Sequence, residues 1–291
     1  MANKKPQGND RAAQARKAAQ AQMKAQERRT AAIIGISAIA VVLLFAGIVY
    51  FIVRSSDIPT LDSDDVVAPA AADVTGGIAV GTGGVAGEDV PEGTARLDIY
   101  QDFMCPICGQ FEDLNAADLD TLREEGDVAI YYHPISILDR YSNGTEFSTR
   151  AANAAATVAD QAPEAFLAFQ AAMYENQPEE NSDGLSDDQI ASIAVTAGVP
   201  QEVADTFVDG TFTKWVIAAT DQSNQDGISG TPMMRMADAG DAFADGKVLD
   251  QETDVMYFQE GALLEYARAV GAGEIVVTAP TSTSPSPSAG E

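Results

Sequence analysis

The chain's only two cysteines stand three positions apart, at the junction of a segment typical of a strand and a segment typical of a helix. Residues 95–103 alternate apolar and polar side chains over much of their length, as a strand does. Residues 110–125 place apolar side chains at helical spacing and end at Gly126, a common helix terminator. Residues 128–134 have the pattern of a second strand. This order predicts a β–α–β unit with the cysteines at the strand-to-helix junction.

The rest of the chain supplies further elements around this unit. Ser186 and Gln189 have the spacing of a capping box and indicate the start of a helix. The other predicted elements are helices within residues 145–220, a strand at 231–236, a hairpin start at the Asp-Gly pair within 243–249, and a helix at 257–270. The order predicts an α/β fold with a mixed sheet flanked by helices and a helical block inserted into it.

Residues 31–53 form a run of 23 residues without a charge. At a rise of about 1.5 Å per residue, a helix of this length can cross the hydrocarbon layer of about 30 Å. Residues 1–29 carry eight lysines and arginines against two acids, which favours a cytoplasmic N-terminus and an extracytoplasmic remainder. The run is longer than the apolar region of a cleaved signal peptide, so we predict a retained, single-pass signal anchor in the cell membrane.

Composition divides the chain into five predicted parts. Residues 55–291 keep eight bases against 42 acids, and such an acidic surface argues against binding to nucleic acid. The parts are a basic cytoplasmic tail at 1–29, the transmembrane anchor at 31–53, a linker at 54–75, a folded domain at 76–275 and a disordered Ser/Thr/Pro-rich tail at 276–291.

The spacing of Cys105 and Cys108 indicates redox chemistry. At the start of a helix, unsatisfied N–H groups and the helix dipole favour a thiolate at the first sulfur, and the thiolate is the nucleophile in disulfide exchange. Pro106 suits the first helical position. A disulfide that closes so short a loop would stabilise the fold little. A zinc site would need two further ligands, and His133 is the only histidine, so we predict no metal.

Two motifs resemble the DsbA-like family of the thioredoxin fold. Residues 102–108 read DFMCPIC after a strand, and residues 229–233 read SGTPM much later, with the helical block between them. The resemblance implies that Cys105 attacks and Cys108 resolves, with no cofactor. It also implies a cis-proline at Pro232 and an inserted helical subdomain at about 145–225. Thr231, which precedes the proline, would offer its backbone to a substrate peptide.

Two positions depart from the family pattern. Ile107 occupies the position at which the best-known oxidants of the family carry a histidine. Ile99 occupies the position of a buried acid found in many thioredoxin-like proteins, six residues before the first cysteine. Asp98 and Asp102 lie nearby, but strand alternation gives neither of them the proton-relay role. The motif alone therefore leaves the direction of electron flow open.

Three functions remain compatible with the sequence. The predicted location favours an oxidase that donates disulfides to exported cysteine-containing proteins and is reoxidised by a membrane redox partner. A reductase or isomerase would use the same residues, and a non-catalytic chaperone module would bind extended peptides. Met233 would line the peptide groove or belong to the strand core. For His133, packing or hydrogen bonding is the favoured role.

Overall fold

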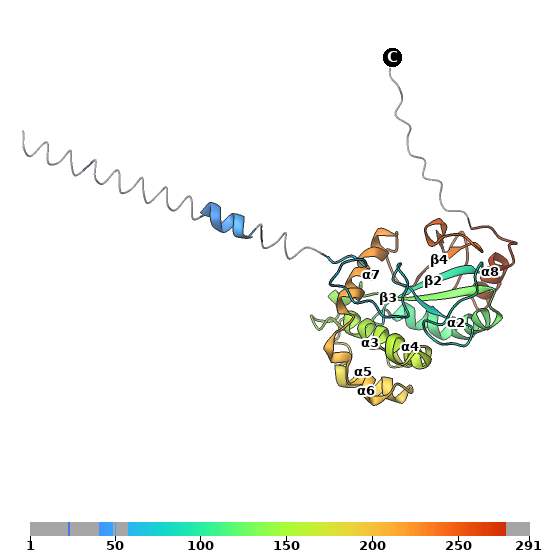
Figure 1. The fold of residues 1–291 in the computed structure, drawn as a ribbon, viewed down its shortest axis with the longest axis horizontal. Coiled ribbons are helices and arrows are strands. Elements are labelled where there is room, and N and C mark those ends of the chain that lie inside the picture. The colour runs from blue at the N-terminus through green and yellow to red at the C-terminus, as the bar shows by residue number, and fades with distance from the viewer. Residues whose placement is uncertain (1–22, 24–40, 49, 51–57, 278–291) are drawn as a thin grey trace, which may run out of the picture. The chain divides into compact units, whose positions relative to one another are not determined.

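The computed structural model describes residues 23, 41–48, 50 and 58–277 (Figure 1). The chain divides into two units, residues 1–57 and 58–291. In the first unit, residues 41–48 are helical. Among the described residues, no helix has the length and apolar character needed to cross a membrane. Most of the predicted anchor and most of both predicted tails lie outside the described residues, so these three parts remain predictions. The predicted C-terminal tail begins later than residue 276, because Val277 is buried and its N–H donates to the Asp238 carboxylate at 2.9 Å.

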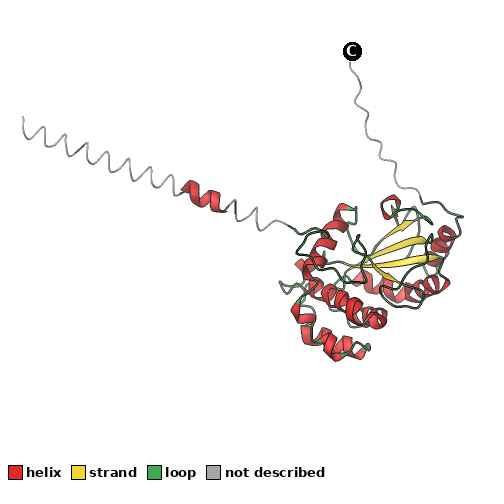
Figure 2. Cartoon of the chain, in the orientation of Figure 1, coloured by secondary structure: helices red, strands yellow, loops and turns green. Residues whose placement is uncertain are grey.

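A five-stranded mixed sheet forms the centre of the second unit (Figure 2). The strand order is β1-β3-β2-β4-β5. β2 and β3 run parallel, and the other neighbouring strands pair antiparallel. The strands are β1 (Ile78–Val80), β2 (Ala95–Gln101), β3 (Val128–Pro134), β4 (Met233–Ala237) and β5 (Lys247–Val248). The predicted mixed sheet with flanking helices is thus confirmed.

Helix α2 connects the two parallel strands, because a parallel pair cannot be joined by a tight turn. It ends at Gly126, which has a left-handed φ of 75°. The backbone N–H of this glycine donates to the Leu122 and Arg123 carbonyl oxygens in the last turn of the helix. The helices are α2 (Pro106–Glu125), α3 (Phe147–Gln161), α4 (Phe166–Glu175), α5 (Asp187–Thr196), α6 (Gln201–Ala204), α7 (Thr213–Gln225) and α8 (Ala262–Gly271). In Figure 1, α2 and α8 lie beside the sheet, whereas α5 and α6 lie farthest from it.

The two faces of the sheet differ in polarity. Strand alternation places Leu97 and Ile99 of β2 on one face, and both belong to the main apolar cluster with Phe111 of α2 and Leu263 of α8. The opposite face carries Asp98 and other polar side chains. The apolar face therefore fixes α2, and with it the cysteines, against the sheet.

The helical block is built around α3. Twelve of the fifteen residues of α3 are buried, so the helix forms the centre of the block and contacts α4, α5, α6 and α7. Its run of alanines allows the neighbouring helices to approach closely. The predicted capping box is confirmed: the Ser186 side chain accepts from the Gln189 backbone, and the Gln189 side chain accepts from the Ser186 backbone.

The predicted linker at 54–75 is wrong for its C-terminal part, because residues from Ile58 onward belong to the second unit. Asp73 forms an ion pair with Arg96 of β2 at 2.7 Å, and Ala71 is buried. The segment also leads into β1, a strand that the sequence did not predict. The polar composition of this segment is typical of a spacer. The fold, however, brings Asp73 next to Arg96, a residue 23 positions away in the sequence.

The predicted hairpin start at 243–249 is also corrected. Residues Phe243–Asp245 form a 3-10 turn, and β5 then pairs with β4. Gly246 has an ordinary φ of −68°, and a Cβ there would lie 2.9 Å from the Met236 carbonyl oxygen. Glycine is required for close approach to β4 and not for a hairpin turn. The last helix begins at Ala262, because Gly261 has a left-handed conformation just before it.

Candidate active site

Cys105 and Cys108 lie at the N-terminus of α2, as the sequence predicts. Cys105 is the N-cap residue with extended backbone angles, and Pro106 follows at the first helical position. The backbone N–H of Cys108 donates to the Cys105 carbonyl oxygen at 2.9 Å, which closes the first turn. Both cysteines are free thiols. Cys105 is 5% exposed and Cys108 is fully buried, so the first cysteine alone of the pair has any exposed area.

The two thiols differ in acidity. The hydrogen bond from the Cys108 thiol lowers the pKa of Cys105 to about 6, against the effect of burial. The Thr231 side chain and the backbone N–H groups of Cys108 and Ile107 lower it further. Burial raises the pKa of Cys108 well above its usual range. Near neutral pH the pair therefore presents a nucleophilic thiolate at Cys105 and a neutral thiol at Cys108.

The second motif lies directly opposite the first cysteine. The Thr231–Pro232 peptide bond is cis, in agreement with the resemblance. Cys105 Sγ lies 3.2 Å from the Thr231 carbonyl oxygen, to which the protonated thiol donates a hydrogen bond. Pro232 is buried, whereas Thr231 and Met233 are partly exposed. The structure thus brings together the residues that the sequence placed in one site, although they come from distant segments.

The residues around this pair present a mixed surface. Ile107 is 44% exposed and Pro106 is exposed, so the two inner residues of the motif face outward. Met233 packs partly against the small cluster of Tyr100, Ile135 and Ile228. Its half-buried side chain contributes to the strand core and also reaches the surface next to the proline.

Sequence reasoning missed the residue that holds the cysteine turn in place. Gln177, just after α4, donates from Nε2 to the carbonyl oxygens of Phe103 at 2.9 Å and Cys105 at 2.8 Å. A Cβ on Gly109 would lie 2.7 Å from Gln177 Oε1, so the glycine leaves room for this amide. No sequence motif marks Gln177, because its partners lie in a different segment.

The proline loop has a support of its own. The hydroxyl of Tyr257 donates to the Pro232 carbonyl oxygen at 3.3 Å. Gln251 donates to the same hydroxyl at 2.9 Å, and the Tyr257 backbone carbonyl accepts from Asn115 on α2 at 3.0 Å. Tyr257 therefore connects the proline loop to the helix that carries the cysteines.

Asp102 is buried immediately before the cysteine turn. Its carboxylate accepts from the Ser148 hydroxyl at 2.6 Å, the Met104 N–H at 2.8 Å and the Leu138 N–H at 2.9 Å. Burial raises the pKa of Asp102 to about 7, against these three hydrogen bonds. The side chain fixes the turn between β2 and α2, and Ile99 is buried in the apolar core.

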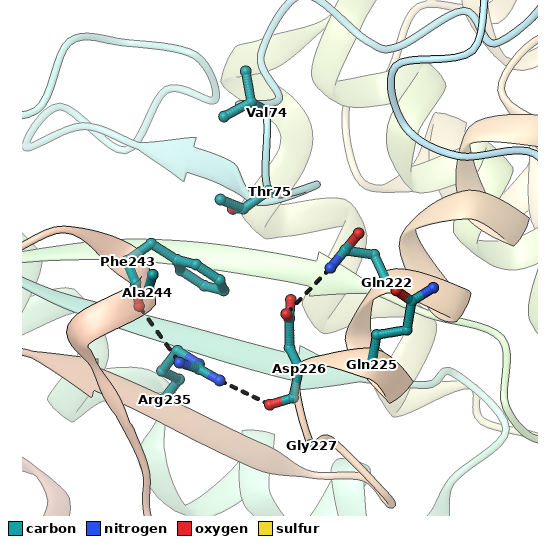
Figure 3. A pocket seen from close by; sticks show the side chains of 9 residues that line it. All are labelled: Val74, Thr75, Gln222, Gln225, Asp226, Gly227, Arg235, Phe243 and Ala244. Carbon is teal, nitrogen blue, oxygen red and sulfur yellow. Dashed lines mark hydrogen bonds between the residues drawn. The ribbon is translucent and has the colours of Figure 1, made fainter. Parts of the chain in front are cut away.

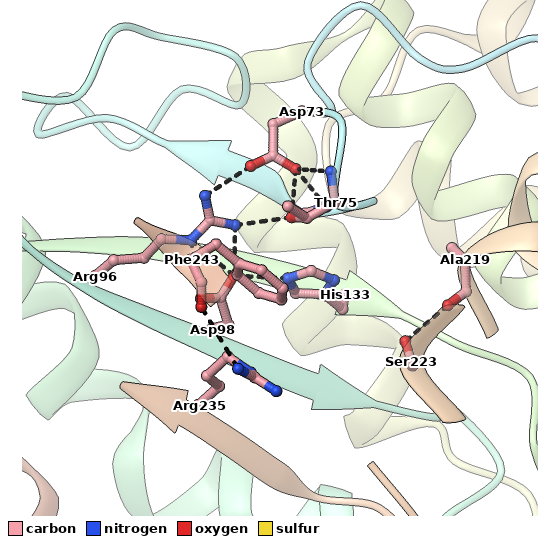
Figure 4. Close-up of polar contacts among 10 residues, drawn as sticks. Asp73, Thr75, Arg96, Asp98, His133, Ala219, Ser223, Arg235 and Phe243 are labelled. Carbon is pink, nitrogen blue, oxygen red and sulfur yellow. Dashed lines mark hydrogen bonds and ion pairs between the residues drawn. The ribbon is translucent and has the colours of Figure 1, made fainter. Parts of the chain in front are cut away.

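Asp98 belongs to a polar network on the other face of the sheet (Figure 4). Arg96 donates to Asp98 through two nitrogens, and His133 Nε2 lies 2.8 Å from Asp98 Oδ1. The His133 ring stacks on Tyr100, with 4.2 Å between the ring centroids. His133 is 1% exposed. These contacts agree with its predicted role in packing and hydrogen bonding.

A cavity of about 580 Å³ opens next to this network (Figure 3). Its lining includes Thr75, Arg235 and Phe243, but neither cysteine nor any residue of the 231–233 segment. Arg235 donates to the backbone carbonyls of Asp226 and Gly246, at 2.7 and 2.9 Å. The cavity is therefore separate from the thiols. In the part of the chain that the structure describes, no group of three or more histidines, cysteines or acids could hold a metal ion.

Comparison with known proteins gives consistent results. The model of the thioredoxin family matches residues 86–246, more than half of the chain. The structure of reduced DsbA from Mycobacterium tuberculosis is 27% identical, with a TM-score of 0.50, and the match covers 69% of this chain and 100% of that one. MdbA from Actinomyces oris, a thiol–disulfide oxidoreductase, has a TM-score of 0.53 at 21% identity over 77% of this chain and 100% of that one, a likeness of fold.

A curated relative matches a shorter segment. The serine/threonine-protein kinase PknE of Mycobacterium tuberculosis is 35% identical over 106 residues, which are 35% of this chain and 19% of the kinase. The chain thus spans about a fifth of the length of the curated relatives it matches.

Proposed function

Because the chain belongs to the thioredoxin family and, within it, to the DsbA-like protein thiol–disulfide oxidoreductases, we propose that it acts as an oxidase of exported proteins. The disulfide between Cys105 and Cys108 would be transferred to pairs of cysteines in its substrates. In this role Cys105 forms the mixed disulfide and Cys108 is released from it. Pro106 and Ile107 separate the two cysteines and form the first turn of α2.

The observation that carries this proposal is the position of Cys105 at the start of α2, with its Sγ 3.2 Å from the Thr231 carbonyl oxygen, where the neighbouring hydrogen bonds lower its pKa to about 6. A stabilised thiolate favours the reduced form of the pair, and a pair whose reduced form is stabilised is a stronger oxidant. At pH 7 a thiol with this pKa is about nine-tenths thiolate, whereas one at the usual pKa is only a few per cent thiolate. Transfer of the disulfide to an unfolded substrate is therefore favourable, because it leaves the enzyme pair in its more stable, reduced form.

Substrate binding is proposed at the edge beside Cys105. Thr231 and Met233 are partly exposed on either side of Pro232, which has no N–H to pair with a neighbouring strand. An extended substrate segment would hydrogen-bond to the Thr231 backbone and contact the Met233 side chain. This position brings a substrate cysteine to Cys105 Sγ.

We propose an extracytoplasmic location for the domain, on the basis of the predicted anchor and the basic N-terminal tail. An oxidising compartment is where new disulfides form and persist. A membrane redox partner would reoxidise the dithiol after each cycle. Reductase activity is the second candidate. It is favoured by Ile107, which cannot stabilise a thiolate as histidine does.

The reduction potential of the Cys105–Cys108 pair separates these two functions. We expect a value well above about −200 mV, and a value near −270 mV, as in thioredoxin, would reject the oxidase. The companion assay follows oxidation of a reduced, unfolded protein with two cysteines. Cys105→Ala and Cys108→Ala should each abolish formation of its disulfide, and full activity of both variants would exclude dithiol chemistry.

A further inference from the structure

Tyr257 is the residue at which the two halves of the site meet. It lies in the loop of residues 249–261, between β5 and α8, and is 2% exposed. Its hydroxyl donates to the Pro232 carbonyl oxygen at 3.3 Å, and its backbone carbonyl accepts from Asn115 Nδ2 at 3.0 Å. One residue therefore contacts both the proline loop (residues 226–232) and α2, the helix that carries the cysteines.

The contact of Tyr257 with α2 is well fixed. Asn115 is fully buried, and its amide nitrogen donates both to the Tyr257 carbonyl oxygen and to the carbonyl oxygen of Phe111, one turn earlier, at 3.0 Å each. The rings of Tyr257 and Phe111 also meet edge to face, with 6.0 Å between their centroids. Because both partners belong to α2, the position of Tyr257 relative to the helix does not depend on the proline loop.

The hydroxyl of Tyr257 is aimed at the proline loop by a second side chain. Gln251 Nε2 donates to the hydroxyl oxygen at 2.9 Å, so the hydrogen of the hydroxyl is left for the Pro232 carbonyl. Gln251 lies in a tight turn. In this turn Asp250 Oδ1 accepts from the backbone N–H groups two and three residues later, both at 2.9 Å, and the N–H of Asp250 donates to the Asp254 carboxylate at 2.9 Å. These contacts make the turn a fixed support for the hydroxyl.

The proline loop is held at its two ends. At the start, Arg235 Nη2 donates to the Asp226 carbonyl oxygen at 2.7 Å, and at the end the Tyr257 hydroxyl holds Pro232. Residues 229–231 between them are partly or fully exposed, and a Cβ on the glycine in the middle would meet no atom within 4 Å. This segment has little packing of its own, so the two ends determine where its last carbonyl lies, the one that faces the first cysteine at 3.2 Å.

We propose that Tyr257 is a positioning residue for disulfide exchange: its hydroxyl fixes the Thr231 backbone at the distance from Cys105 Sγ at which a substrate segment binds and reacts. This inference rests on the oxidase function proposed above. Tyr257 acts through Pro232 and exchanges no proton or electron with the substrate. The same spacing serves the reduced enzyme, because the Thr231 side chain helps to lower the pKa of Cys105. Loss of the hydroxyl leaves the Pro232 carbonyl without this donor, and the loop is then free to move away from the cysteine.

The first experiment measures the pKa of Cys105 in the reduced full chain, from the rate of alkylation by iodoacetamide across the pH range. Tyr257→Phe keeps the ring and the backbone contact with α2 and removes the hydroxyl alone. It should raise the pKa of Cys105 by about half to one pH unit, the range of a single neutral hydrogen bond. The matched control is Tyr132→Phe: Tyr132 of β3 is 6% exposed, and its ring contacts Phe166 of α4. Equal pKa values of Cys105 in the two variants would overturn the proposal.

The second experiment tests whether Gln251 acts through the hydroxyl. Gln251→Ala alone should also raise the pKa of Cys105, by a smaller amount, because the hydroxyl loses the donor that aims it. In the Tyr257→Phe background, the same substitution should leave this pKa unchanged, since the group that Gln251 supports is already absent. A packing role of either residue would give additive shifts or none, and either result would reject the positioning role.

The third experiment follows the oxidised full chain as it oxidises a synthetic dithiol peptide over a range of peptide concentrations. Tyr257→Phe should raise the half-saturating concentration about three- to tenfold and change the limiting rate much less, because a displaced proline loop weakens binding of the substrate segment. A variant that is only less stable would instead lose the same fraction of the rate at every concentration, and that result would contradict the proposal.

The outcomes separate this role from the proposed function. If the wild type fails to oxidise the peptide, the oxidase function is wrong, while the pKa of Cys105 still tests Tyr257, since alkylation needs no disulfide exchange. If the wild type reacts and Tyr257→Phe matches it in both the pKa of Cys105 and the half-saturating concentration, only the positioning role is wrong. Gln251→Ala keeps the test available if Tyr257→Phe fails to fold, because Gln251 is exposed and its loss leaves the core intact.

Discussion

Replacing Cys108 by alanine should raise the pKa of Cys105, because the hydrogen bond from the Cys108 thiol is the largest cause of its fall to about 6. A hydrogen bond to a charged group contributes about 1.5–3 kcal/mol, which corresponds to about one to two pH units. The variant should therefore titrate between about pH 7 and 8. The thiolate fraction at pH 7 would fall from about nine-tenths to between about one-half and one-tenth.

The assay is the rate of alkylation of Cys105 by iodoacetamide across the pH range, since only the thiolate reacts. Cys108→Ser is the matched control, because its hydroxyl can still donate to Cys105 and should keep the pKa close to the wild-type value. The Thr231 side chain and the backbone N–H groups act equally in both variants. A midpoint near pH 6 in Cys108→Ala would refute the assignment of the low pKa to the neighbouring thiol.

Three further predictions concern the support of the site. Gln177→Ala should lower the free energy of unfolding by about 1–3 kcal/mol, because two hydrogen bonds to the cysteine turn are lost, and urea unfolding measures this change. The raised pKa of Asp102, about 7, means that its contribution to stability is greatest at low pH and is lost as the pH rises through 7. The free energy of unfolding of Asp102→Asn, minus that of the wild type, should therefore be about 2–3 kcal/mol larger at pH 8 than at pH 5. Urea unfolding at both pH values measures this difference. Phe111→Ala should cost about 3–5 kcal/mol, because the ring is fully buried between helix and sheet, and a thermal midpoint close to that of the wild type would contradict this.

The local structure around the cysteines was predictable from the sequence because its signals are local. β3 has the predicted bounds, and α2 ends at the glycine that marks its terminus. The cysteine pair lies at the start of that helix, and Ser186 and Gln189 form the capping box that their spacing indicates. Each of these features depends on residues a few positions apart, within the reach of backbone geometry and short side chains.

The contacts that complete the site were not predictable, because they join distant segments. Gln177 reaches the Cys105 carbonyl and Tyr257 reaches the Pro232 carbonyl only after the helical block and the sheet have packed. Asp73 lies in a polar stretch that has the composition of a spacer, and its partner Arg96 is on β2. β1 has three residues, too few for a periodic signal. In each case the position of the residue depends on tertiary contacts, and local patterns in one sequence do not predict such contacts.

The close approach of Gln177 to Gly109 has a consequence for how the sequence can change over evolution. Any side chain at position 109 would press on the amide that holds the cysteine turn, since even a Cβ would lie 2.7 Å from Gln177 Oε1. A side chain at position 109 should therefore be tolerated only together with a residue at position 177 that leaves room for it and still donates to the cysteine turn. Among descendants of a common ancestor, we expect positions 109 and 177 to covary, which would link the history of the helical insertion to that of the motif it supports.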